Sequence, residues 1–115
     1  MAISRREALK RGISYGTGVI NHGNDSIAYD RALKTFPADD SYVALRAAIA
    51  EGDAESALPA AQAFRKRCGE LALSELYLRA AAVVAALEEG SLPPVEELDA
   101  LDAARAGIVA YLERA

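Results

Sequence analysis

The single histidine and the single cysteine are the most reactive side chains of this sequence. His22 lies in the segment Asn21-His22-Gly23-Asn24-Asp25, whose residue types favour a turn. An imidazole nitrogen can carry a phosphoryl group or a proton, but no basic residue stands three positions after His22 to assist it. We therefore expect an exposed histidine without a catalytic role, and phosphoryl transfer through His22 is the alternative.

Cys68 falls on the apolar face of an expected helix, between Phe64 and Leu71. This position predicts a buried thiol that contributes only to packing. The basic neighbours Lys66 and Arg67 would lower the pKa of an exposed thiol, so a reactive cysteine is the alternative.

Neither the carboxylates nor the glycines form a catalytic motif. Gly16-x-Gly18 follows no strand and lacks a third glycine or a lysine-serine pair, so it predicts a turn rather than a phosphate-binding loop. Carboxylates gather at the start of the expected last helix, where negative charge suits the helix dipole, and no pair is isolated among apolar residues. The sequence implies no cofactor and no metal site, and it favours a non-catalytic domain while leaving an enzyme as the alternative. The carboxylates in question are Glu96, Glu97, Asp99 and Asp102.

The composition predicts that helices position these residues. Apolar residues make up 52% of the chain, Trp is absent, and the common residues Ala, Leu, Glu and Arg favour helix. Four long segments carry apolar residues at helical spacing, and short turns with Gly or Pro separate them. In the second segment, Pro59 predicts either a kink or a helix that becomes regular only near Ser56. The predicted N-caps are Asp39 or Asp40 for the first segment, Asp53 for the second and Ser74 for the third, and the fourth segment starts at Pro93-Pro94.

Four such segments joined by short turns predict an all-α fold, an antiparallel up-down four-helix bundle. A short additional helix over residues 26–36, capped by Asp25 or Ser26 and ended by Pro37, would cover one end of it. Residues 1–12 form an N-terminal basic lead with a short helical pattern, and residues 13–23 predict a loop with room for one helical turn. The bundle domain is expected to span residues 13–115.

One segment of the second expected helix resembles the phosphoacceptor helix of histidine-containing phosphotransfer (HPt) domains. It reads Ala60-Ala61-Gln62-Ala63-Phe64-Arg65-Lys66-Arg67-Cys68-Gly69-Glu70-Leu71-Ala72-Leu73-Ser74-Glu75-Leu76. The family's pattern is alanine-histidine-x-leucine-lysine-glycine, followed by small residues, a glycine and a leucine. The matching positions are Gln62 for the histidine, Phe64 for the leucine, Arg65 for the lysine, Lys66 for the first glycine, and Gly69 and Leu76 for the later pair.

Two further segments extend the resemblance to about residues 13–113. Ile27-Ala28-Tyr29-Asp30-Arg31-Ala32-Leu33-Lys34-Thr35-Phe36-Pro37 is similar to the helix that precedes the bundle in the family. Glu51-Gly52-Asp53 is similar to the turn before the phosphoacceptor helix. The resemblance implies an HPt-like bundle in which residue 62 is exposed midway along the second long helix.

Two positions at the centre of the motif depart from the family. Phosphoryl relay needs a nucleophilic ring nitrogen, whereas the lone pair of the Gln62 amide nitrogen is delocalised into its carbonyl. Lys66 lies one turn further along the same helix face and fills with a cation the space that the family's glycine leaves open. Both departures predict that relay chemistry is absent.

The resemblance thus implies an HPt-like protein of two-component phosphorelay signalling that docks without carrying phosphate. Its expected partner is a response-regulator receiver domain or a sensor histidine kinase. Receiver domains are the usual partners of the HPt family, and they present an acidic pocket to which a cationic helix face could bind. A working phosphocarrier, through His22 or through a histidine altered in this sequence, is one alternative. A structural helical bundle whose basic residues are only a solvated face is another. The expected contact residues are Gln62, Arg65, Lys66 and Gly69, with Arg67 at the flank.

Charge, cysteine content and hydropathy limit the partners and the cellular location that we expect. The net charge of −4 is mild and mixed along the chain, so no nucleic-acid partner is implied. One cysteine cannot form an internal disulfide, which suits a reducing cytoplasm. No apolar run reaches the ~18–20 residues that span a bilayer, and no apolar region of a secretion signal follows the basic N-terminus. We therefore expect a cytoplasmic protein without a membrane partner.

Overall fold

Helices account for most of the chain that the structure, a computed structural model, describes, namely residues 3–114. This confirms the predicted all-α class. Met1, Ala2 and Ala115 belong to the predicted lead and bundle domain but lie outside the described residues. The helices are α1 (Arg5–Lys10), α2 (Tyr15–Asn21), α3 (Ser26–Lys34), the short 3-10 helix η1 (Phe36–Ala38), α4 (Asp40–Ala50), α5 (Ala54–Glu70), α6 (Ser74–Glu88) and α7 (Val95–Arg114).

Aspartate side chains start three of these helices as the sequence predicts. The carboxylates of Asp25, Asp39 and Asp53 accept hydrogen bonds from free backbone N–H groups in the first turns of α3, α4 and α5. The predicted cap at Ser74 is wrong by one position, because Leu73 is the N-cap and Ser74 is already helical. The Ser74 hydroxyl instead lies 2.6 Å from the Ser14 hydroxyl.

Pro59 lies inside α5, which begins at Ala54 and continues through the proline to Glu70. The sequence left open whether the regular helix starts nearer Ser56, and the structure places its start two residues earlier. Gly52 and Gly90 follow the ends of α4 and α6 with φ of 71° and 82°, so they end these helices in two of the Gly-containing turns that the sequence predicts.

The segment predicted as a loop over residues 13–23 contains the helix α2, and this is the main error of the sequence prediction for the fold. The three glycines of residues 13–23 lower the intrinsic helix propensity of this segment, which is why the sequence predicts a loop. In the structure, Gly18 is buried, and a Cβ atom placed on it would lie only 2.0 Å from the Tyr29 ring. The glycine therefore allows α2 to approach α3 closely, and this packing outweighs local propensity.

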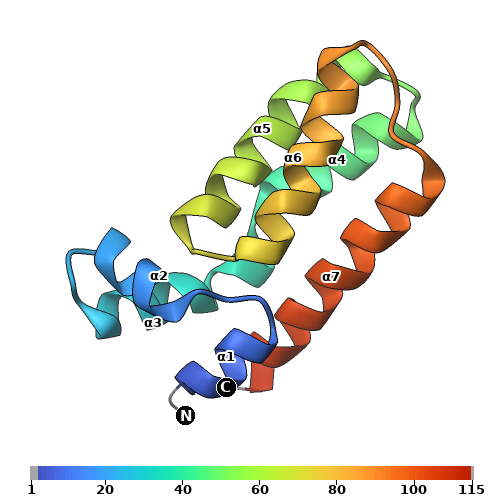
Figure 1. The fold of residues 1–115 in the computed structure, drawn as a ribbon. Helices are drawn as coiled ribbons and strands as arrows, with labels where there is room; N and C mark the ends of the chain where they lie inside the picture. The colour runs from blue at the N-terminus through green and yellow to red at the C-terminus, as the bar shows by residue number, and fades with distance from the viewer. Residues whose placement is uncertain (1–2, 115) are drawn as a thin grey trace.

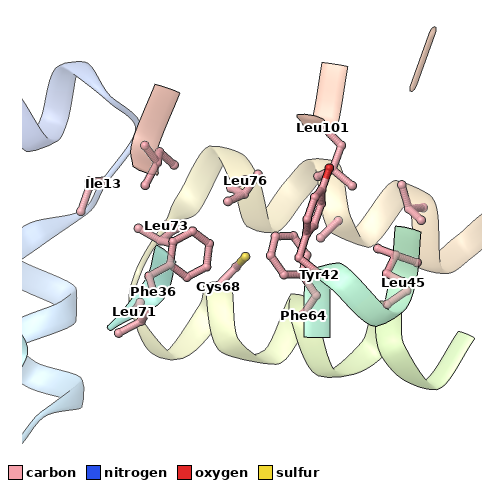
Figure 2. Packing of buried hydrophobic residues seen from close by; sticks show 14 of the residues in the cluster. Ile13, Phe36, Tyr42, Leu45, Phe64, Cys68, Leu71, Leu73, Leu76 and Leu101 are labelled. Atoms are coloured by element: carbon pink, nitrogen blue, oxygen red, sulfur yellow. The ribbon is translucent and has the colours of Figure 1, made fainter. Parts of the chain in front are cut away.

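The four long helices carry most of the core. Helix α5 lies between α4 and α6 and makes its most extensive contacts with them, while α7 runs along α6 (Figure 1). Figure 2 shows Phe64 and Cys68 of α5 directed toward Tyr42 of α4, Leu76 of α6 and Leu101 of α7. All five side chains are buried. Ala57 and Ala61 complete the buried stripe of α5 and permit close helix packing.

The three N-terminal helices cover one end of α5 and α6, where the sequence predicted a single short helix (Figure 1). The buried Tyr29 hydroxyl donates a hydrogen bond of 2.6 Å to the carbonyl oxygen of Leu71, directly after α5. Ile13 pairs with Leu73 through an isolated antiparallel bridge. Ile3 and Ala8 of the basic lead are buried in the same core cluster as the bundle, so the described part of the lead packs against the rest of the protein.

Candidate functional site

Helix α5 brings four of the sequence-predicted contact residues onto one face, which we call the α5 face: Gln62, Arg65, Lys66 and Gly69. Their spacing of three, four and seven residues places them along one side of the helix. Gln62 and Lys66 are exposed, whereas Arg65 and Gly69 are half-buried. The buried stripe of α5, with Phe64 and Cys68, points the other way into the core, so the amide at position 62 is accessible to a partner.

Arg67, the predicted flanking contact, binds side chains of this protein. Its Nε lies 3.8 Å from Oδ2 of Asp39, and its Nη2 donates a 2.8 Å hydrogen bond to Oγ1 of Thr35. The guanidinium thereby ties α5 to the segment just before α4. We therefore assign Arg67 a structural role and leave it out of the α5 face.

The neighbouring helix α6 adds an apolar surface that sequence reasoning missed. Tyr77 and Leu78 are 38% and 69% exposed, and a Cβ atom on Gly69 would lie 3.2 Å from the Tyr77 ring. The glycine at position 69 therefore makes room for Tyr77 against α5. The helical spacing in the sequence could have indicated this exposed surface, because both residues fall outside the buried stripe of Leu76 and Ala80.

A hollow of about 320 Å³ lies beside this apolar surface, between the start of α2, the end of α5 and the start of α6. Apolar atoms dominate its wall, and the hydroxyl pair of Ser14 and Ser74 adds polar groups. The α5 face and the exposed part of α6 are thus adjacent, one polar and cationic and the other apolar. The residues lining the hollow are Ser14, Thr17, Cys68, Gly69, Ala72, Ser74, Tyr77 and Leu78.

The side chain of Cys68 is fully buried, which confirms the predicted packing role. Burial, followed by the negative charge of Asp39, raises the pKa of the thiol to about 12. The effect of the nearby cations Arg105 and Arg67 is smaller. At neutral pH the sulfur is protonated and shielded, so it does not act as a nucleophile.

His22 occupies the C-cap of α2, not the exposed loop that the sequence predicted. Its Nδ1 donates a 2.9 Å hydrogen bond to the carbonyl oxygen of Gly18, and its ring centroid lies 5.3 Å from that of Tyr29. The half-buried imidazole thus closes the end of a helix. Among the described residues, no carboxylate or cation hydrogen-bonds to its ring, so it lacks the partner of an activated base.

The carboxylates at the start of α7 do not gather into a site. Asp102 pairs with Arg46 of α4 at 3.3 Å, while Glu96 and Asp99 are exposed. In residues 3–114, no group of His, Cys, Asp or Glu side chains is arranged to hold a metal ion.

The comparisons with known proteins give no match: no family model, no curated protein and no solved structure is similar to this chain. None of the helices in the described part of the chain has the length and apolar character needed to cross a bilayer.

Proposed function

We propose that this protein is an HPt-like docking module of two-component signalling that cannot carry phosphate. The observation that carries the proposal is the exposed amide of Gln62 on α5, with the exposed ammonium of Lys66 one turn further along the same face. The resemblance of the surrounding segment to the phosphoacceptor helix supplies the partner class. This proposal includes the finer fold assignment, an up-down four-helix bundle formed by α4 to α7.

Geometry supports docking because the face is accessible at the position where the family presents its histidine. Gln62 retains hydrogen-bonding groups but has no nucleophilic nitrogen. Arg65 and Lys66 form no ion pair within the described residues, so both charges are available to an acidic partner. Such exposed charges chiefly accelerate association and make binding depend on salt.

The exposed Tyr77 and Leu78 supply the apolar part of the proposed contact. Interfaces combine a desolvated apolar centre with a polar rim, and tyrosine is among the residues enriched there. A receiver domain that covers both the α5 face and these two side chains would bury apolar and charged surface together. Cations alone would give only a weak, salt-screened interaction.

A phosphotransfer and binding assay against purified receiver domains of the source organism tests the proposal. We expect binding to at least one phosphorylated receiver without acid-labile label appearing on this protein. Lys66→Glu and Tyr77→Ala should each weaken binding about tenfold or more, which corresponds to at least about 1.4 kcal/mol. Arg114→Glu, an exposed charge at the end of α7, is the matched control and should bind as the unmodified protein does.

Label on the unmodified protein would overturn the absence of transfer and favour the phosphocarrier alternative. No binding to any receiver would contradict docking and leave a structural bundle.

A further inference from the structure

Charged side chains are distributed unevenly along the molecule. Helix α1 and the residue after it carry Arg5, Arg6, Lys10 and Arg11 against a single carboxylate, Glu7. No basic residue stands between Ala80 and Ala104, a stretch that contains Glu88, Glu89, Glu96, Glu97, Asp99 and Asp102. Figure 1 shows α1 at one end of the molecule and the connection between α6 and α7 at the other. The longest dimension of the protein, 40 Å, separates a basic end from an acidic end.

The basic end has a groove lined by Arg5, Leu9, Tyr15, Gly16 and Ile20, which we call the α1–α2 groove. Two hollows of about 320 and 560 Å³ share Arg5, Tyr15 and Gly16, and extend to Leu9 and to Ile20 respectively. Leu9 and Ile20 are 72% and 67% exposed. The guanidinium of Arg5, which lines both hollows, lies 5.5 Å from the centroid of the Tyr15 ring. The groove therefore offers two apolar contacts and a cation.

The acidic end presents the opposite combination, in a segment that we call the α7 tip: Leu92, Val95, Glu96 and Asp99. Leu92 and Val95 are 43% and 67% exposed, and both carboxylates are exposed. Val95 and Glu96 lie in the first turn of α7. Two aliphatic side chains and two negative charges thus project from one short stretch of chain.

The charges that define these two surfaces have no partner of opposite sign within the described part of the chain. Neither Arg5 nor Arg6 forms an ion pair there, and neither Glu96 nor Asp99 does. Since the two surfaces lie at opposite ends of the molecule, one copy cannot bring them together.

We propose that the α1–α2 groove binds the α7 tip of a second copy of this chain. The occupant is identified by complementarity of charge and of apolar contacts: Arg5 faces Glu96 and Asp99, and Leu9 and Ile20 receive Leu92 and Val95. The contact joins two different surfaces, so it is heterologous and leaves a free groove at one end and a free tip at the other. A heterologous contact gives either closed rings or open chains, and two surfaces at opposite ends of the long axis favour open head-to-tail chains.

Sedimentation of the full chain at increasing concentration tests this proposal. At about 20 mM salt we expect the average mass to rise above the monomer's 12.1 kDa without a plateau. At about 500 mM salt we expect it to return to the monomer, because screening removes the charge contribution.

Two variants define the geometry of the contact. Arg5→Gln with Leu9→Gln removes the groove but leaves the tip, and Val95→Gln with Glu96→Gln removes the tip but leaves the groove. We expect each variant alone to stay monomeric at low salt. An equimolar mixture should reach a plateau at twice the monomer mass, because only one intact groove and one intact tip remain per pair. The control Val43→Gln with Arg114→Gln also removes one exposed aliphatic side chain and one cation, and should associate like the unmodified protein.

An unmodified protein that stays at 12.1 kDa at low salt overturns the proposal. A plateau at a closed dimer, or a mixture of the two variants that remains monomeric, also overturns it. The α5 face is unchanged in both variants, so they should bind a receiver domain normally if the proposed function is right. Failure of self-association and failure of docking are thus separate results.

Discussion

At the scale of single residues, the proposed function depends on Gln62, which is exposed on α5. An imidazole nitrogen can form a phosphoramidate, whereas an amide nitrogen has no available lone pair. The rest of the α5 face keeps groups that recognise a partner, with Lys66 exposed and Arg65 half-buried. Under the proposed function, this face would recognise a partner without accepting phosphate.

Cys68 provides a prediction about reactivity and pH. Since burial raises the pKa of its thiol from 9.0 to about 12, a thiol reagent at about pH 7 should modify the native protein only at the rate at which it unfolds. The unfolded chain loses this proton first as the pH rises, so the stabilisation is complete below pH 9 and is lost progressively up to about pH 12.

Chemical unfolding at several pH values measures this loss. Tyr15, whose hydroxyl donates to Asp30, has a pKa raised from 10.0 to about 12, chiefly by burial, and adds to the loss above pH 10. Cys68→Ala should therefore lose less stability than the unmodified protein between pH 9 and 10. Equal losses, or rapid native labelling, would show that the sulfur is not protected.

Ala72 provides a second prediction at this scale. It is the residue after the C-cap of α5 and has φ of 56°, the left-handed conformation in which a Cβ atom is strained. The hydrogen bonds from Leu73 N to Cys68 O and from Ala72 N to Gly69 O form a Schellman motif, which normally has glycine at this position.

Ala72→Gly should therefore stabilise the protein by up to ~1 kcal/mol, since relief of ~1–2 kcal/mol of strain outweighs the loss of one buried methyl group. Gly90→Ala is the reciprocal control: φ is 82°, no atom lies within 4 Å of the added Cβ, and stability should fall by ~1 kcal/mol. Thermal unfolding of the two variants gives the comparison, and a lower stability of Ala72→Gly would contradict the assigned strain.

Helix α2 is the element that best separates what local sequence can predict from what packing decides. Carboxylate caps act within one turn, so Asp25, Asp39 and Asp53 could be identified from the sequence, as could the stops at Gly52 and Gly90. The helical state of α2 depends on the approach of Gly18 to Tyr29 of α3, which no local pattern contains.

The same contact provides a prediction for this element. Gly18→Ala would place a methyl group 2.0 Å from a buried ring whose hydroxyl is fixed on Leu71, so we expect a loss of ~1–3 kcal/mol or more. Gly107→Ala, in the middle of α7 with no atom near the added Cβ, is the matched control and should gain up to ~1 kcal/mol. Denaturant unfolding compares them, and similar effects of the two substitutions would contradict the close packing of α2.

The sequence predicts which residues share one face of α5, but not which residues of other helices contact them. Spacing alone places Gln62, Arg65, Lys66 and Gly69 on one face of α5. Arg67 forms an ion pair with Asp39, which lies 28 positions away in the sequence. Only tertiary packing brings the two side chains together. The exposure of Tyr77 and Leu78 likewise depends on how α6 packs against α5.

For the whole molecule, three surfaces occupy different places: the α5 face with the exposed part of α6, the α1–α2 groove and the α7 tip. Helix α1 and the start of α7 lie toward opposite ends of the molecule, and α5 lies between them (Figure 1). The hollow beside Tyr77 and Leu78 shares Ser14 and Thr17 with the groove, but Gln62, Arg65 and Lys66 line neither hollow of the groove. A head-to-tail chain would therefore leave these three side chains of every α5 face free to bind a partner. Such a chain would present many docking faces together and raise the avidity for a clustered partner.

The most direct measurement of the central claim is transfer of labelled phosphate from phosphorylated receiver domains to two forms of this protein. The unmodified chain should bind a receiver but remain unlabelled. The Gln62→His, Lys66→Gly variant should bind the same receiver and acquire acid-labile label, because only the reactive nitrogen and the room around it are missing from the α5 face. Label on the unmodified chain, or a receiver that binds neither form, would contradict the assignment of α5 as a docking face derived from a phosphoacceptor helix.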